Sequence, residues 1–522
     1  MVSYRHAQVL ALLIVAAMTA ISLTAPPFIA YDPAFGLTRW YGLLHSTPFD
    51  TAIGPDPADI SRDIVQAASW WSPGQYLVPG LLTLTGLRLG TALVMIAGLC
   101  NLTALLGWIT VARAFDLGPR VALAATLLIA TFRFSSSAYG IYSGGEILLQ
   151  AVTPWIVLAA WRLPHVTLMT AMLIAFVATA IGFLAKLNGL IVVASAFGAA
   201  GMLAMVQARR LTPGLIGGVF GALIAVALVY VFWFAAKPVT HFTGGGQGFG
   251  FVRAAFALSA PWTSALSWQD FIVWLTQTPR RVILHDDAAL VLIGLLPVAV
   301  LLAAALAFDR NAPENERVVR RFSLLMLGGF TLLMLVLYLR GAPIPLEERH
   351  FRPVGMLLFL CLLAMALRPG IHRGVRYALL ALFSTMSMYG LASFSARVMS
   401  AQQQTVERYS WTLQPNADAS SLAAIQQAFA TEGRDALFYL GAPELIATLP
   451  PNARIIVEAP ALMSDASISA VRYKGRVKGH MYLLLSNTLP AEKREAILRS
   501  FADYDTDKWS NSVSTRATLY SQ

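Results

Sequence analysis

The sequence predicts a polytopic α-helical membrane protein that ends in a small α/β domain outside the membrane. Hydrophobic residues make up 57% of the 522 residues and charged residues only 12%, whereas soluble proteins carry about 25% charged residues. Eleven apolar stretches run from residue 7 to residue 396, each with the roughly 17 to 25 residues that a bilayer-spanning helix needs. After about residue 401 the chain returns to ordinary polarity.

The eleven stretches are the predicted transmembrane helices. We interpret the first as an uncleaved span and not as a signal peptide, because its apolar run is long and ten further spans follow. The approximate ranges are 7–30, 90–112, 119–138, 145–161, 166–185, 188–206, 214–235, 287–308, 322–340, 351–367 and 377–396.

The arginines of the connecting turns predict the orientation of these spans. Every second turn is basic, so the positive-inside rule places the basic turns and the N-terminus in the cytoplasm. The two long loops, 31–89 and 236–286, and the tail then lie outside. The basic segments carry Arg5, Arg113, Arg120, Arg162, Arg209, Arg210, Arg310, Arg317, Arg320, Arg321, Arg368, Arg373 and Arg376.

Residues 73–88 are an apolar segment within the first long loop. The segment contains two prolines and three glycines and is barely one bilayer thickness long. If it crossed the membrane, every later loop would change sides and the arginines would lie outside. We therefore expect an interfacial or re-entrant helix on the outer face.

The tail predicts a small α/β domain. Strands are expected at 435–440, 454–458, 478–485 and near 515–520, and helices at 442–449 and 490–502. The predicted organisation is thus a membrane domain over residues 1–400 and an extracytoplasmic domain over residues 401–522.

The charge and cysteine content exclude two classes of function. The formal net charge is +11, but nucleic-acid binders concentrate their cations on one face, and here the cations lie in short loops. The two cysteines, Cys100 and Cys361, both lie inside apolar stretches. They cannot form a disulfide framework or a zinc site.

Ionisable residues at membrane depth or at the mouth of a span are costly, so each is a candidate site residue. Five such residues lie at the same outer face in the predicted topology, although they are far apart in the sequence. Two carboxylates and three cations at one level suit an anionic, lipid-linked substrate. The five are Asp32, Glu146, Lys186, Arg349 and Arg352.

Short motifs surround these residues in a fixed order. Asp32 directly follows the first span, and the amphipathic stretch WSPGQYLVPGLLTLTGLRLG (71–90) comes next. A turn with Tyr139 and Tyr142 leads to Glu146, and FLAKLNG (183–189) and RHFRP (349–353) come later. This order resembles the C-type superfamily of integral membrane glycosyltransferases, in the branch of the protein O-mannosyltransferases and the lipid A aminoarabinose transferases.

The chain departs from that family at three positions. Pro33 follows Asp32 where the family commonly has Glu, Glu146 stands where it often has Asp, and Ala185 replaces the Thr of a Leu-Thr-Lys-like turn. The resemblance covers about residues 1–400 and gives the tail no role.

The resemblance implies a C-type fold and an inverting transferase. Such an enzyme would move a hexose or pentose from a polyprenyl phosphate to a glycan, lipid or protein acceptor of the cell envelope, at the outer face of a bacterial inner membrane. Asp32 would be the catalytic base, and Lys186, Arg349 and Arg352 would stabilise the leaving phosphate. No nucleic acid is expected as a partner.

The remaining site residues have supporting roles in this interpretation. Glu146 would orient the acceptor or, with Asp32, hold a divalent cation such as Mg²⁺ or Mn²⁺, the candidate cofactor. Tyr139 and Tyr142 would contact the substrate. His241 leads into TGGGQGFGF (243–251), which we interpret as a mobile lid over the site.

Structural interpretations compete with each assignment. Asp32 could begin a helix, Glu146 could favour a helix dipole, Lys186 and Arg352 could reach lipid headgroups, and Arg349 could pair with a neighbouring glutamate. The acidic run 56–63 (DPADISRD) could hold a metal or form a solvated turn. For the whole protein, the alternatives are a secondary transporter or lipid flippase and a non-catalytic membrane scaffold.

Overall fold

The computed structural model describes residues 2–67, 71–208, 212–234, 250–276, 287–342, 344–470 and 472–522. Contacts divide the chain into two compact units. The membrane unit comprises Met1–Thr19, Gly98–Ala138 and Gly145–Ala396, and the mixed unit comprises Ala20–Ala97, Tyr139–Gly144 and Arg397–Gln522. The first long loop therefore groups with the tail, and the division at residue 400 stays a prediction.

Nine helices of the described chain are long and apolar enough to span a membrane. Two shorter apolar helices, α5 (Pro119–Thr131) and α16 (Arg352–Leu367), complete the eleven predicted segments. The nine are α1 (Tyr4–Ser22), α4 (Leu89–Ala114), α7 (Gly145–Arg162, continued by η1, Leu163–His165), α8 (Leu168–Ala185), α9 (Asn188–Ala208), α10 (Pro213–Val229, continued by η2, Tyr230–Phe234), α13 to α14 (Asp287–Phe308, through η4, Leu290–Leu295), α15 (Glu314–Leu339) and α17 (Arg373–Ala401).

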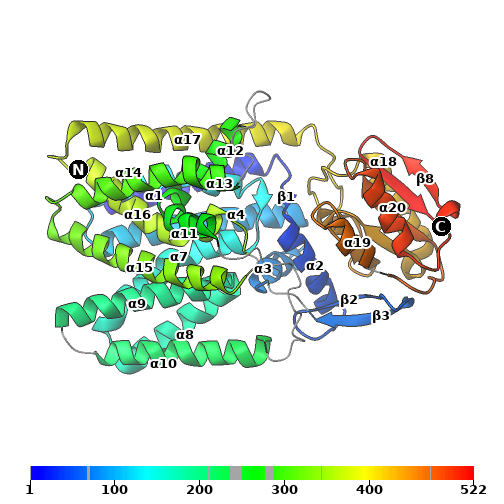
Figure 1. Ribbon diagram of the computed structural model, residues 1–522, viewed down its shortest axis with the longest axis horizontal. Helices are drawn as coiled ribbons and strands as arrows, with labels where there is room; N and C mark the ends of the chain where they lie inside the picture. Colours follow the sequence, from blue (N-terminus) through cyan, green and yellow to red (C-terminus); the bar gives the residue numbers. More distant parts are fainter. Residues whose placement is uncertain are drawn as a thin grey trace. The chain divides into compact units, whose positions relative to one another are not determined.

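The helices of the membrane unit run side by side, with α8, α9 and α10 at one edge (Figure 1). Helix α16 is the central one, since every residue from Pro353 to Ala366 is buried. A helix covered by protein on all sides need not match the thickness of the bilayer. The shortness of α16 is therefore compatible with its place in the bundle.

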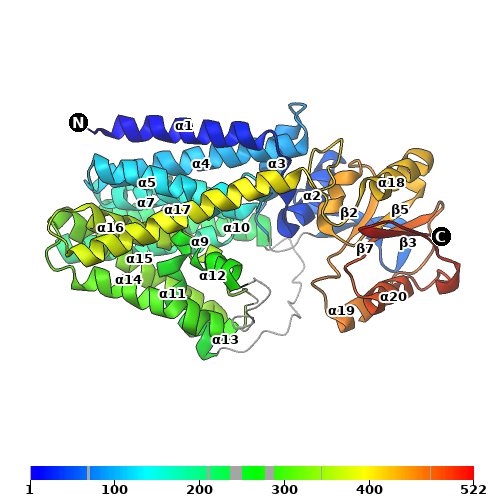
Figure 2. The same cartoon turned by 90° about the horizontal axis from the view of Figure 1, so that it is seen from above.

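The predicted second long loop contains a helix with one buried face. Helix α11 (Phe251–Thr263) packs beside α14 and also contacts α15 and α16 (Figure 2). Its Phe256 is fully buried, with its ring 5.6 Å from that of Phe351. Helix α12 (Trp268–Thr276) follows after η3 (Ser264–Leu266).

Arginines of two predicted cytoplasmic turns close one end of the bundle. Arg320 donates to Asp309 at 2.7 Å and to the carbonyl of Leu306 at 2.9 Å, which caps the end of α14. Arg368 also binds Asp309, and it donates to Glu316 at 2.6 Å. These arginines therefore join α14, α15 and α16 in addition to any effect on orientation.

The tail folds around a five-stranded sheet in the order β6-β5-β7-β9-β8. The strands are β5 (Leu437–Leu440), β6 (Arg454–Val457), β7 (Met481–Ser486), β8 (Ser510–Val513) and β9 (Ala517–Ser521), with the first three parallel and the last two antiparallel. Helix α18 (Ala419–Glu432) covers one face, and α19 (Asp465–Ala470) and α20 (Ala491–Ser500) cover the other (Figure 2).

The sequence predicted the four buried strands and α20. Residues 442–449 form a 3₁₀ helix, η7 (Pro443–Thr448), as predicted except for its tighter turn. Helices α18 and α19 and strand β8 were missed. Strand β8 reads SNSV and is exposed along its whole length, so it carries no apolar alternation to reveal it.

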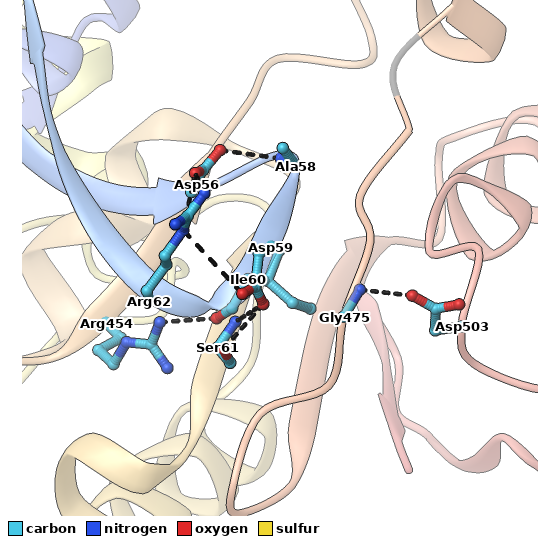
Figure 3. A network of polar contacts seen from close by, with 9 residues as sticks. All are labelled: Asp56, Ala58, Asp59, Ile60, Ser61, Arg62, Arg454, Gly475 and Asp503. Atoms are coloured by element: carbon cyan, nitrogen blue, oxygen red, sulfur yellow. Dashed lines mark hydrogen bonds and ion pairs between the residues drawn. The ribbon is translucent and has the colours of Figure 1, made fainter.

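A hairpin from the first long loop packs against the tail within the mixed unit. It consists of β2 (Thr51–Asp56) and β3 (Asp59–Ala67), and Ile60 is fully buried in the core of the tail. Asp63 accepts hydrogen bonds from Arg454 at 2.8 Å and Arg434 at 3.0 Å, while Asp56 is bound by Arg62 at 2.8 Å (Figure 3). The acidic run 56–63 therefore supplies ion-pair partners that hold the hairpin.

The segment 73–88 contains only the ten-residue helix α3 (Gly74–Thr83). At 1.5 Å per residue such a helix is about 15 Å long, half of what a bilayer core requires. It packs on α2 (Tyr31–Leu44), where a Cβ on Gly80 would lie 2.2 Å from the Trp40 ring. Its length agrees with an interfacial or re-entrant helix.

Candidate functional site

Four of the predicted site residues meet in the membrane unit. Glu146 lies in the first turn of α7, Lys186 caps the C-terminus of α8, and Arg349 lies in the 3₁₀ helix η5 (Glu348–His350). Arg352 begins α16. All four line one pocket.

Glu146 is the centre of this cluster. Its Oε1 atom lies 2.6 Å from Nζ of Lys186 and 3.0 Å from Nη1 of Arg349. The glutamate side chain is 10% exposed and those of the two cations are 20% and 32% exposed. Two cations from distant parts of the chain therefore share one largely buried carboxylate oxygen.

Two glycines permit this approach. A Cβ on Gly145 would lie 2.8 Å from the carbonyl oxygen of Ala185 and 3.2 Å from Cβ of Lys186, so glycine lets α7 begin against the α8–α9 turn. A Cβ on Gly189 would lie 2.0 Å from the carbonyl oxygen of Gly182, so glycine also lets α9 reverse tightly on α8. The extended backbone of Lys186, with φ −162° and ψ 146°, then directs the chain away from the end of α8.

Arg349 is further held by the acidic residue two positions before it. Its Nε also pairs with Glu347, as the structural interpretation had anticipated. Glu348 instead turns toward α12, where its Oε2 accepts from the backbone N–H of Gln269 at 2.9 Å and its own N–H donates to that side chain at 2.9 Å. Burial raises the pKa of Glu348 to about 7, because a charge is poorly solvated there.

Arg352 contacts an aromatic ring and a backbone carbonyl. Its guanidinium lies 4.8 Å from the centroid of Phe134, and its Nε donates to the carbonyl of Ser264 at 3.4 Å. A guanidinium over a ring face is attracted to the electron-rich face. Arg352 is thus oriented by α6 (Arg133–Ser137) and η3 as well as by its own helix.

The pocket is lined by charged, polar and apolar side chains. One turn along α7 from Glu146, Gln150 donates to Ser135 at 3.0 Å and to Asn101 at 3.2 Å. The lining residues are Trp108, Glu146, Leu149, Gln150, Thr153, Lys186, Asn188, Arg349, Arg352, Pro353 and Met356.

The other predicted residues lie in the mixed unit or outside the described chain. Asp32 lies in the first turn of α2, shortly after β1 (Phe28–Ile29), which pairs in parallel with β4 (Ile141–Tyr142). Tyr139 and Tyr142 are buried, and Tyr142 donates to the carbonyl of Gln75 at 2.9 Å. The predicted convergence of Asp32 with the cations stays a prediction. His241 falls in residues 235–249, which are not described.

The geometry around Glu146 does not suit the predicted divalent cation. Within the described residues no group of three His, Cys, Asp or Glu side chains could hold a metal ion. Glu146 presents one oxygen to two side-chain cations, and a divalent cation at that oxygen would meet their repulsion. The donor set seen here therefore does not fit the metal, and we derive no step through one.

Two residues of the site were not predicted, although both lie inside the quoted motifs. Asn188 of FLAKLNG begins α9 and lines the pocket, and His350 of RHFRP lies beside Arg349. Nδ2 of Asn188 lies 3.2 Å from Nδ1 of His350. Neither residue carries a permanent charge, so the search for costly charges at membrane depth did not single them out.

No family model and no curated protein sequence matches the chain. Among solved structures, ArnT from Cupriavidus metallidurans bound to undecaprenyl phosphate is similar over 98% of this chain and 97% of its own, with 12% identity and a TM-score of 0.52. The arabinofuranosyltransferase AftD from Mycobacteria is also similar, with 16% identity and a TM-score of 0.43 over 40% of its length. The likeness to ArnT shows the fold alone: the chain has an ArnT-like fold, in agreement with the predicted fold class of a multi-pass helical protein.

Proposed function

We propose that the protein is an inverting glycosyltransferase. It moves a sugar from a polyprenyl-phosphate donor to a glycan, lipid or protein acceptor of the cell envelope, at the outer face of a bacterial inner membrane. The observation that carries the proposal is the placement of Lys186 and Arg349 on the same oxygen of Glu146 at a pocket. The ArnT fold and its bound undecaprenyl phosphate support this class of donor.

The cations suit the leaving group of this reaction. An ammonium and a guanidinium that already bind one carboxylate oxygen can bind a phosphate oxygen in the same way. The phosphate would exchange places with the Glu146 carboxylate between the two cations. Arg352 lines the same pocket and would add a third positive charge as negative charge develops on the phosphate.

The reaction is a substitution at the anomeric carbon. The acceptor oxygen or nitrogen forms a bond to this carbon from the face opposite the phosphate, while the carbon–oxygen bond to the phosphate breaks and its electron pair stays with the phosphate. The acceptor proton passes to the carboxylate of Asp32, which is the general base in this proposal. Lys186, Arg349 and Arg352 stabilise the phosphate that leaves.

The test is a transfer assay with the purified full chain. Radiolabelled polyprenyl-phosphate sugars are incubated with protein and membrane extract, and transfer to extract components is counted. Asp32→Asn and Lys186→Met should each lower the rate by a factor of roughly 100 or more. Arg499→Gln removes an exposed cation from the tail and should leave the rate unchanged.

The assay also separates the rival functions. A flippase or transporter would move the lipid or its sugar across reconstituted vesicles without any transfer product, and a scaffold would do neither. If no donor gives a product while the folded protein still binds undecaprenyl phosphate, the transferase proposal is wrong. Addition of about 10 mM EDTA, which removes exchangeable Mg²⁺ or Mn²⁺, should leave the transfer activity unchanged.

A further inference from the structure

One hydrogen bond joins the two segments that carry the phosphate-binding cations. Nδ2 of Asn188 lies 3.2 Å from Nδ1 of His350. Asn188 stands two residues after Lys186, and His350 directly follows Arg349. The contact therefore connects the α8–α9 turn to η5, although 162 positions separate the two residues in the chain.

The environment of His350 keeps its ring neutral. The side chain is buried, and Lys186, Arg349 and Arg352 oppose a further positive charge there, with only Glu146 favouring it. Burial and these cations lower the pKa of His350 well below its ordinary value. In a neutral ring whose Nδ1 accepts from the Asn188 amide, the proton resides on Nε2.

Packing alone gives no reason for a histidine at this place. The Nε2 atom is buried, and it has no hydrogen-bond partner among the described residues. Burying a polar N–H without a partner is unfavourable, and an apolar side chain of similar size would avoid that cost. The feature that an apolar side chain would lose is the bond between Nδ1 and Asn188.

We propose that His350 and Asn188 are positioning residues whose hydrogen bond sets the spacing between Lys186 and Arg349, so that both cations meet the same phosphate oxygen. This inference rests on the proposed function. His350 is not among the residues that line the pocket, so it acts through its neighbours and not by direct contact with substrate.

The physical need for such a link follows from the charges. Lys186 and Arg349 repel each other, and the lysine ammonium sits on a flexible four-carbon chain. Without the Asn188–His350 bond, once the phosphate has left with the lipid, only Glu146 would hold the α8–α9 turn and η5 together through the two cations. A hydrogen bond that begins at Asn188 and ends beside the Arg349 backbone keeps them in register throughout the reaction cycle.

The test is a double-mutant cycle in the transfer assay. His350→Leu and Asn188→Leu should each raise the KM for the polyprenyl-phosphate sugar about tenfold, the effect of one lost hydrogen bond near charged groups, with kcat changed less. The double variant should be no worse than either single variant, because both remove the same bond. His350→Gln, whose side-chain oxygen can accept from Asn188, should restore the KM to within about threefold.

Folding and binding are followed separately by thermal unfolding of each detergent-solubilised variant with and without undecaprenyl phosphate. Stabilisation by this probe should weaken in His350→Leu and return in His350→Gln. If a leucine variant does not fold, the comparison of His350→Gln with Asn188→Ala decides, since His350→Gln keeps a donor and an acceptor at this contact and Asn188→Ala removes the donor.

The positioning role is overturned if His350→Leu leaves the KM and probe binding unchanged, or if the two leucine effects multiply. An active wild type with either result refutes this inference and leaves the transferase intact. A wild type that transfers no sugar refutes the proposed function, and the probe-binding cycle then still decides whether the pair positions the cations.

Discussion

Replacing Glu146 by glutamine should have opposite effects on folding and on phosphate binding. The change removes the charge that Lys186 and Arg349 share while keeping the shape of the side chain. Breaking a fully buried pair costs about 3–5 kcal/mol. The two cations here are 20% and 32% exposed, so we expect about 2–3 kcal/mol after allowance for solvent screening.

The same change should tighten the binding of undecaprenyl phosphate. If the proposed function holds, the lipid phosphate must displace the Glu146 carboxylate from both cations of the wild type, and in Glu146→Gln it need not. A gain of about 1.4 kcal/mol, a fraction of the pair's stabilisation, corresponds to tenfold tighter binding.

Thermal unfolding in detergent, scanned against the concentration of undecaprenyl phosphate, measures both effects. The midpoint without lipid should fall by a few degrees, and the stabilisation by lipid should grow. Glu347→Gln is the matched control, because Glu347 also pairs with Arg349 but is 43% exposed and should contribute at most about 1 kcal/mol. Weaker lipid binding by Glu146→Gln would refute the idea that carboxylate and phosphate compete for these cations.

Further predictions concern the supports of the site and of the mixed unit. Gly145→Ala should lower the transfer rate about tenfold, because the added Cβ would lie 2.8 Å from the Ala185 carbonyl oxygen. Gly198→Ala on α9 is the control, because its Cβ would meet nothing within 4 Å and the rate should not change. The transfer rates of the two folded variants measure the difference. The raised pKa of Glu348, from 4.5 to about 7, means that the folded state holds this proton more tightly than the unfolded state. The contribution of this proton to the free energy of unfolding is therefore full below pH ~4.5 and is lost as the pH rises through ~7. Because glutamine resembles the protonated side chain, Glu348→Gln should stabilise the protein by up to roughly 3 kcal/mol at pH 8 and little at pH 4.5. Unfolding midpoints at the two pH values measure the difference. Asp63→Asn should weaken the ion pairs with Arg434 and Arg454 and destabilise the hairpin by about 1–3 kcal/mol, seen as faster proteolysis between residues 51 and 67. With Cys100 and Cys361 replaced, a short bifunctional cross-linker should join cysteines introduced by Asp32→Cys and Arg349→Cys; a failure would contradict the convergence of the base with the cations.

The membrane-spanning architecture could be predicted because it depends on length and polarity alone. Seven of the eleven apolar stretches were recovered as helices whose two ends lie within two residues of the prediction. Of the others, α5 ends earlier, at Thr131, and α15 and α17 extend beyond the predicted ranges, to Glu314–Leu339 and Arg373–Ala401. The first stretch ends at Ser22 and not near residue 30. The early end has a local cause, because Pro26 and Pro27 follow and then β1 begins at Phe28. The bounds and the buried face of helix α11 could not be predicted, because its thirteen residues are too few to span a bilayer and lie in a predicted loop.

The cations of the site could be predicted for the same reason, since a charge at membrane depth is visible in the sequence as an exception. Their partners could not. Whether Lys186 pairs with Glu146 or reaches lipid headgroups depends on the backbone approach that Gly145 and Gly189 permit, and nothing in the sequence gives that distance.

The network around Glu146 also shows why neutral residues matter at such a site. Lys186 and Arg349 can lie close together only while a negatively charged group lies between them. In the proposed reaction the donor phosphate replaces the Glu146 carboxylate when it binds, and the carboxylate returns when the phosphate leaves. The spacing of the cations must therefore be set by contacts that do not carry charge and do not leave. The Asn188–His350 bond and the glycine contacts of the α8–α9 turn meet both conditions, whereas the Arg349–Glu347 pair does not. It follows that variants of the neutral contacts should impair every donor alike, and variants of Glu347 should have effects that fade as salt is added.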